Sequence, residues 1–272
     1  MPALRQESIQ GMKTYLFIAA LFFASTTLEA QETTPKIAPL NIGGIDNKTG
    51  GTITGIVRFK GAKPEAKPVT DIAGNAFCKQ CYKGDLPKHD DFVFGKNGSD
   101  DTLVNVLVYV SKGLEGKKFE PTKEPALLDQ VGCMYTPHVV AVMVGQTLKI
   151  RNSDATLHNV MATPWTNAQF NLGMPSKNQV IERVFRQPEL KISTKCFMHP
   201  WMSAYIHVLD NPFFALTQAD GTFTLKGLPP GEYEISVLHE TSLFDPTPAT
   251  ATVKIQGNAT QKLDFTFQQK TK

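Results

Sequence analysis

The sequence predicts an all-β fold, and three observations favour it. Short apolar runs rich in β-branched residues recur along the chain, Gly and Pro interrupt nearly every gap between them, and no segment keeps a helical period beyond a couple of turns. At 272 residues the chain also exceeds the usual size of one small domain. Because its predicted strands fall into two groups with different sequence patterns, we expect two β-sandwiches.

The N-terminal residues have the layout of a secretory signal. A short basic start at Lys13, an apolar run over 15–24 and a small residue at Ala30 predict a signal over residues 1–30. The run is short for a bilayer span, and no later segment approaches the required length of about 20 apolar residues. We therefore expect export with no transmembrane segment after cleavage, and a retained N-terminal anchor is the alternative. Residues 31–50 lack an apolar period and predict a flexible leader.

Strands are predicted from residue 51 onward. Residues 51–59 alternate in the β manner, and 103–110 form a continuous apolar, β-branched run, as a buried strand does. Further strands are expected at 139–144, 147–152, 180–185, 189–195, 203–209, 222–226, 232–238, 250–255 and 261–267.

The most informative segment is the run Cys-Phe-Met-His-Pro-Trp-Met at 196–202. It places a thiolate, an imidazole and a thioether in one short loop, and a second imidazole, His158, lies upstream. Soft sulfur favours Cu(I) while imidazole suits both copper oxidation states, so this donor set predicts one copper ion held for single-electron transfer. The expected equatorial ligands are Cys196, His158 and His199, and the expected axial ligand is Met202.

Several alternatives to this site remain open. Met198 and Met161 are rivals for the axial position, and zinc is an alternative metal, although a thioether is a poor zinc ligand. A buried, inert thiol is the structural alternative for Cys196. No His-x-His pair occurs, so a trinuclear copper cluster is not supported, and the loop lacks the second Cys of a dinuclear site. Four other histidines are expected to be structural or exposed: His89, His138, His207 and His239.

Three further cysteines remain if copper takes Cys196. Cys78 and Cys81 have the spacing of a redox or metal pair, but Tyr82 follows where haem attachment needs His. An exported chain permits disulfides. We expect one structural bridge from Cys78 or Cys81 to Cys133, with one thiol left over.

Residues 135–210 resemble the cupredoxin (blue-copper) family, of the amicyanin and plastocyanin kind. The resemblance is carried by the strand pair 139–144 and 148–152, by His158-Asn159-Val160 and by the Cys196 loop. It implies a Greek-key sandwich in which Asn159 hydrogen-bonds across to that loop. It also implies that electrons leave through the exposed ring edge of His199, within an apolar patch of Phe197, Pro200 and Trp201.

A second resemblance lies outside this region. Residues 220–233 form a strand, a Pro-Pro-Gly turn and another strand, and resemble the carboxypeptidase regulatory-like, transthyretin-like β-sandwich family. The opening strand near residue 51 is similar to the first strand of that family. We therefore expect one discontinuous sandwich from 51–121 and 211–268, with a cupredoxin domain over 122–210 inserted between its parts. In the alternative, 51–121 simply extends the cupredoxin domain.

The predicted function is electron transfer without catalysis. With 28 Lys plus Arg against 25 Asp plus Glu and no dense basic run, nucleic acid is not an expected partner. No zinc-protease motif or nucleophile elbow occurs. We expect a periplasmic or secreted mononuclear copper protein that exchanges electrons with a redox protein such as a cytochrome or a dehydrogenase. The alternative is a copper carrier, or a scaffold or adhesion protein with a structural metal.

Overall fold

The computed structural model describes residues 50–270, which lie in one compact unit. The predicted signal over 1–30 and the predicted leader, apart from Gly50, lie outside the described residues. Strands dominate the described part, so the predicted all-β class is confirmed. Within 50–270, no helix is long and apolar enough to cross a membrane.

Two sheets share a core built from strands at both ends of the described chain. They contain β1 (Gly51–Lys60), β2 (Phe94–Asn97), β3 (Asp100–Leu103), β4 (Leu107–Lys112), β14 (Phe214–Leu216), β15 (Thr222–Leu228), β16 (Gly231–Leu238), β17 (Phe244–Thr247), β18 (Thr250–Ile255), β19 (Thr260–Lys262) and β20 (Phe265–Gln269). One sheet has the order β17-β20-β1-β3-β2, with β15 and β19 also pairing with β1, and the other has the order β14-β4-β16-β18. We call this pair of sheets the split sandwich. Its buried core includes Ile53, Val108, Ile235 and Phe265.

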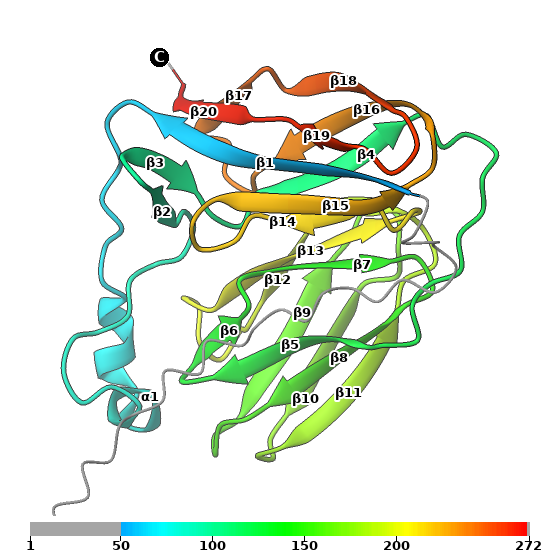
Figure 1. Cartoon of the computed structure of the whole chain (residues 1–272). Coiled ribbons are helices and arrows are strands. Elements are labelled where there is room, and N and C mark those ends of the chain that lie inside the picture. The colour runs from blue at the N-terminus through cyan, green and yellow to red at the C-terminus, as the bar shows by residue number, and fades with distance from the viewer. Residues whose placement is uncertain (1–49, 271–272) are drawn as a thin grey trace, which may run out of the picture. The chain divides into compact units, whose positions relative to one another are not determined.

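The intervening strands pair among themselves and form a second sandwich, the central sandwich (Figure 1). They are β5 (Ala126–Val131), β6 (Met134–Thr136), β7 (Val139–Met143), β8 (Thr147–Asn152), β9 (His158–Thr163), β10 (Phe170–Met174), β11 (Gln179–Val184), β12 (Glu189–Lys195) and β13 (Ser203–Leu209). The sheet orders are β10-β9-β12-β13-β7 and β11-β8-β5-β6. Inward side chains such as Leu128, Ile150, Val160 and Ile206 form its core.

Residues 61–93 connect β1 to β2 but pack on the central sandwich. They contain the short helices η1 (Thr70–Gly74) and α1 (Ala76–Gln80), and Val69, Ile72 and Cys78 are buried in the central core. Asn75 begins α1, because its side chain accepts a hydrogen bond from the amide of Cys78 at 3.0 Å. We call residues 61–93 the covering segment. It belongs to the split sandwich by connectivity and to the central sandwich by packing.

Two predicted strands are interrupted in the structure. The run 103–110 is not one strand: β3 ends at Leu103 and β4 begins at Leu107, because Asn105 adopts a left-handed backbone with φ 63°. The run 261–267 is likewise divided between β19 and β20. There the Asp264 carboxylate accepts the amide N–H of Ile56 at 3.1 Å and so interrupts the backbone ladder.

A small third cluster of buried side chains connects the two sandwiches. It contains Leu107 from β4, Met143 from β7, Leu209 from β13 and Phe214 from β14. Both sandwiches therefore contribute apolar side chains to the contact between them. The strand pairing groups 51–112 with 214–269, and the exact domain limits stay a prediction.

Candidate metal centre

Strand pairing brings the two parts of the predicted ligand set together. His158 is the first residue of β9, and Cys196 directly follows β12. The two strands are antiparallel with Lys195 opposite Met161, so the chain leaving β12 passes beside the start of β9. The loop 196–202 then leads into β13. Residues far apart in sequence thus become neighbours through the ladder register.

Three donor atoms converge at this point. Nδ1 of His158 lies 2.9 Å from Nδ1 of His199, and Sγ of Cys196 lies 3.7 Å from the same His199 nitrogen. One such atom from each residue lies within 4.8 Å of the others, and all three side chains are buried. A thiol and two imidazoles gathered away from water are a donor set suited to copper or zinc.

Met202 closes the loop that carries these donors. Its N–H donates to the carbonyl oxygen of His199 at 2.9 Å, and its own carbonyl accepts the amide of Cys196 at 3.2 Å. Its side chain is fully buried in the same core as the Cys196 thiol. Among the rivals, Met198 is 52% exposed, and Met161 lies on the face of β9 opposite to the histidine donor. The axial role of Met202 stays a prediction, which its burial favours.

Asn159 joins β9 to the loop 196–202. Its backbone N–H donates to Sγ of Cys196 at 3.5 Å, and its side-chain oxygen accepts the amide N–H of Phe197 at 2.6 Å. Its side-chain nitrogen donates to Asn171 on β10 at 2.6 Å. One residue therefore orients the thiol and anchors the first turn of the loop.

Asp154 holds His158 from behind. Its carboxylate lies 2.9 Å from Nε2 of His158 and accepts the amide N–H groups of Gly132 and Cys133, each at 2.8 Å. Because a carboxylate accepts but does not donate, Nε2 carries the proton and Nδ1 presents its lone pair toward the other donors. Sequence reasoning assigned no role to Asp154, although its position four residues before a candidate ligand was a usable signal.

The surroundings stabilise the thiolate form of Cys196. Burial alone would raise the pKa of this thiol, but its interactions with His158, His199 and the Asn159 amide outweigh it and lower the pKa to about 6. Since the thiolate is the form that binds metal, the metal-free chain is already prepared for binding at neutral pH.

The covering segment closes the side of the centre that was expected to be open. His199 is 2% exposed, and its Nε2 lies 3.2 Å from the side-chain nitrogen of Asn75. A disulfide between Cys78 and Cys133 fastens this segment to the turn between β5 and β6. The expectation that the ring edge of His199 reaches the surface is therefore wrong. No local pattern in the sequence links residues 61–93 to this loop.

The remaining predicted residues lie around the loop. Phe197 is 62% exposed and Pro200 is also exposed, whereas Trp201 is half-buried and donates its ring N–H to the carbonyl of Cys133 at 3.0 Å. Of the two candidate partners of Cys133, Cys78 forms the bridge. The other, Cys81, is a free and exposed thiol.

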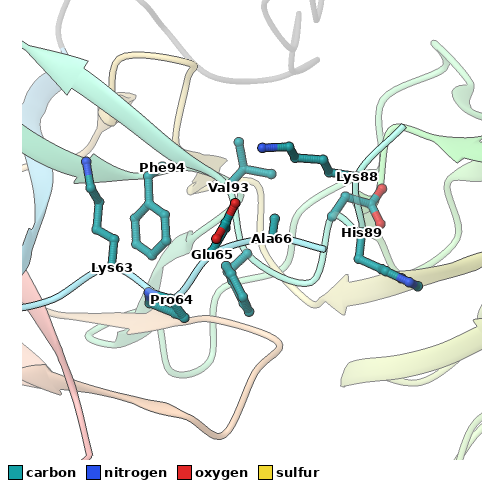
Figure 2. Close-up of a pocket in the computed structure, with 10 residues that line it drawn as sticks. Lys63, Pro64, Glu65, Ala66, Lys88, His89, Val93 and Phe94 are labelled. Carbon is teal, nitrogen blue, oxygen red and sulfur yellow. The ribbon is translucent and has the colours of Figure 1, made fainter. Parts of the chain in front are cut away.

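Other candidate groups lie apart from these donors. His138, His207 and His239 are buried outside the converging set, as expected for structural histidines. An open hollow of about 510 Å³ is lined by residues 63–66, 88–90 and 92–94, at the two ends of the covering segment. Figure 2 shows its Lys63 and His89 side chains pointing in different directions rather than toward one centre.

Comparisons with known proteins return structural likeness alone. No family model matches the chain, and no curated protein matches it. Similar solved structures include a Cu-containing nitrite reductase from Thermus scotoductus SA-01, with 20% identity, 36% of this chain and 25% of that chain covered, and a TM-score of 0.29. A purple cupredoxin from Nitrosopumilus maritimus has 21% identity, 30% and 98% coverage, and a TM-score of 0.27. A reduced Cu(I) form of an amicyanin variant has 23% identity, 33% and 91% coverage, and a TM-score of 0.28. The match spans a quarter of the nitrite reductase.

Proposed function

We propose that this chain binds one copper ion through His158, Cys196, His199 and Met202 and transfers single electrons. The observation that carries the proposal is the convergence of one thiol and two imidazole nitrogens in a buried site, with Nδ1 to Nδ1 at 2.9 Å. Two ring nitrogens at this distance share one proton in the metal-free chain. A metal ion would replace that proton. The donor set fits copper better than zinc, because a buried thioether is a poor zinc ligand.

The protein holds the ligands of this centre rigidly and excludes water from it. Copper would supply a one-electron couple, and the loop supplies soft and borderline donors that suit both oxidation states. Asp154 and Asn75 support the two rings from behind, and Asn159 supports the thiolate. Ligands that are already in place need little rearrangement when the charge of the centre changes, which favours electron transfer.

Electrons would leave through the exposed side of the loop. His199 is covered, so its ring edge does not offer a path to a partner. Phe197 is bonded to the proposed ligand Cys196 and is largely exposed, and Met198, which follows it in the chain, is an exposed apolar side chain as well. Redox encounters need small interfaces, and this patch would meet that need. Of the predicted exit patch, Phe197 is retained as the main contact, beside Pro200, whereas the half-buried Trp201 donates its ring N–H to the Cys133 carbonyl in the turn between β5 and β6.

A second candidate function is copper carriage. The observation that favours it is the closed covering segment, because a buried metal is protected from solvent and from direct contact with a redox partner. An electron-transfer protein should oxidise and reduce its bound copper repeatedly without losing the ion. A copper carrier should instead transfer the ion to an acceptor.

Cellular setting and partners follow from the sequence. We propose export to the periplasm or beyond, with a cytochrome or a dehydrogenase as the redox partner and no catalytic activity of its own. The split sandwich resembles the regulatory-like family in residues 220–233 and would act as a non-catalytic support.

Spectroscopy of the copper-loaded protein tests the proposal. The Cu(II) form is expected to absorb intensely in the visible range and to give an EPR spectrum with narrow copper hyperfine splitting. Cys196→Ser should abolish both features, while Cys81→Ser, which removes an exposed thiol, should retain them. A colourless Cu(II) complex of the wild type contradicts the proposal. Reversible cycling with a cytochrome, as opposed to loss of copper to a chelating acceptor, separates the two candidate functions.

A further inference from the structure

The covering segment connects two strands of the split sandwich and closes one side of the proposed metal centre. It leaves β1, buries Val69 and Ile72 in the core of the central sandwich, and places Asn75 against the ring of His199. In the described chain, Cys78–Cys133 is the only disulfide that joins residues 61–93 to the central sandwich. While that bond is intact, the covering segment stays cross-linked to the turn between β5 and β6.

The fastening point is coupled to the proposed ligands. Cys133 stands in the turn between β5 and β6, where Tyr82 of the covering segment also donates its hydroxyl to the Gly132 carbonyl at 2.7 Å. The amides of this turn bind Asp154, which in turn holds His158. Sγ of Cys133 lies within 4.8 Å of a His158 ring nitrogen and an Asp154 carboxylate oxygen. The bridge thus sits directly behind the metal site.

A free thiol stands next to this bridge. Cys81 caps the C-terminal end of α1, three residues after Cys78, and residues with that spacing face each other on one helical turn. The Cβ of Cys81 lies 4.0 Å from the position that a Cβ on Gly132 would occupy, which places it beside the turn that carries Cys133. The described chain therefore holds an exposed free thiol beside a disulfide.

We propose that residues 61–93 form a thiol-controlled cover over the metal centre, locked by Cys78–Cys133 and released when Cys81 takes Cys78 from Cys133. The Cys81 thiolate attacks Sγ of Cys78, the Cys78–Cys133 bond breaks, and Cys133 leaves as a thiolate that is then protonated. The proton that Cys81 loses to solvent balances the one that Cys133 gains. One disulfide replaces another, so no oxidant or reductant is consumed.

Release would have two consequences at the centre. Nε2 of His199 loses the covering Asn75 and becomes accessible, and the freed Cys133 thiol stands close to the proposed ligands as an additional soft donor. Soft thiolates hold Cu(I), so the released form suits copper loading or exchange, while the locked form suits retention. The role in copper exchange rests on the proposed function, whereas the cover itself does not.

Disulfide mapping of the metal-free wild type tests the exchange. The protein is incubated at pH 8.5, quenched with acid, unfolded, labelled with a maleimide and digested for mass spectrometry. We expect a fraction of molecules with Cys78 bonded to Cys81 and the label on Cys133, and none in the Cys81→Ser control. If the maleimide labels only Cys81 and Cys196, and never Cys133, at every incubation time, the proposal is overturned.

Histidine footprinting tests the opening without any metal. In Cys133→Ser, Cys78 is left to pair with Cys81, and reaction of His199 with diethyl pyrocarbonate should be about tenfold or more faster than in the wild type. His207, buried in β13, reports in the same digest that the central sandwich is folded. Equal His199 rates in the two proteins overturn the cover. A His199 that opens in a protein lacking the blue absorption would support the cover and refute the copper function, so the two failures are distinguishable.

Discussion

Each imidazole of the proposed centre is supported by a residue from a different part of the chain. Asp154, in the loop after β8, binds Nε2 of His158, and Asn75 of the covering segment lies against Nε2 of His199. A carboxylate fixes the orientation of a ring and the position of its proton more firmly than an amide does. The reason is that a carboxylate can only accept a hydrogen bond, whereas an amide can also donate one. The two histidines are therefore expected to differ in how strongly they are held.

Asp154→Asn tests the support of His158. An amide can donate as well as accept, so it no longer selects the ring form that presents Nδ1, and loss of such a support typically weakens metal binding by about 10-fold to 100-fold. We expect copper affinity to fall within that range, as measured by competition with a chelator. Glu182→Gln, on the edge strand β11, is the matched control and should bind copper as the wild type does. Unchanged affinity in Asp154→Asn would show that His158 is held by packing alone.

Phe197→Ala tests the exit route. The side chain is 62% exposed and its amide is held by Asn159, so truncation should leave the loop and the visible spectrum unchanged. Electron transfer to a redox partner should slow by about tenfold, because the contact patch of a small redox interface is reduced. Stopped-flow rates for Phe197→Ala and for Trp165→Ala, which removes an exposed aromatic ring elsewhere, provide the comparison. Equal slowing in both variants would remove Phe197 from the route.

At the scale of elements, the centre depends on how β9 and β12 are paired. The ladder places the start of β9 beside the chain that leaves β12, and alternation along β9 buries His158, Val160 and Ala162 on one face. A shift by one residue would turn His158 outward, so the hydrophobic pattern of the strand also sets the position of the ligand. The covering segment is an element of a different kind, since it is held by the burial of Val69 and Ile72 and by a disulfide rather than by strand pairing with the central sandwich.

The Cys78–Cys133 bridge is expected to stabilise the whole fold. It closes a loop of 55 residues, and cross-linking a loop of that length is worth about 2–4 kcal/mol through the entropy of the unfolded chain. Cys78→Ser should lower the free energy of unfolding in denaturant by this amount. Cys81→Ser, which removes the free thiol, should leave it unchanged within error. Similar losses in both variants would mean that the bridge contributes little beyond the side chains themselves.

At the scale of the whole molecule, a buried charged cluster ties three parts of the chain together. His138, just before β7, lies 3.1 Å from the Asp90 carboxylate of the covering segment and 3.5 Å from that of Glu240, which follows β16. Burial alone would lower the pKa of His138, but its pairing with these two carboxylates outweighs burial and raises the pKa to about 10. The imidazolium therefore joins the covering segment, the central sandwich and the split sandwich.

This cluster predicts a pH-dependent contribution to stability. The folded pKa of His138 lies above its unfolded value of 6.5, so its contribution is complete below about pH 6.5 and is lost as the pH rises through about 10. His138→Gln should cost about 3 kcal/mol at pH 6, since removing one partner leaves buried charge unpaired. The difference between wild type and variant, from urea unfolding at a series of pH values, should shrink toward pH 10. A difference independent of pH would assign the effect to packing. His207→Gln is the control: because the pKa of this buried histidine is lowered to about 3, its difference from the wild type should grow, and not shrink, as the pH rises through about 6.5.

Much of the fold could be read from local pattern. Strands such as β8 and β13 agree with their predicted ranges because apolar alternation over six or seven residues specifies a half-buried strand. The interruptions at Asn105 and Asp264 could not be foreseen, because each depends on a backbone angle or a side-chain contact made in the folded state. Short strands such as β6 and β14 lack enough residues for a period to appear.

The sequence by itself determined the all-β class and predicted that His158, Cys196 and His199 come together, because alternation and ligand chemistry depend on residue types and spacing. It also narrowed the bridge to Cys133 with Cys78 or Cys81. Only the tertiary structure decided that Cys78 is the partner, that Asp154 and Asn75 support the ligand rings, and that His199 is covered. These are contacts between segments that no local pattern connects, and they exist because burial of Val69 and Ile72 draws the covering segment onto the central sandwich.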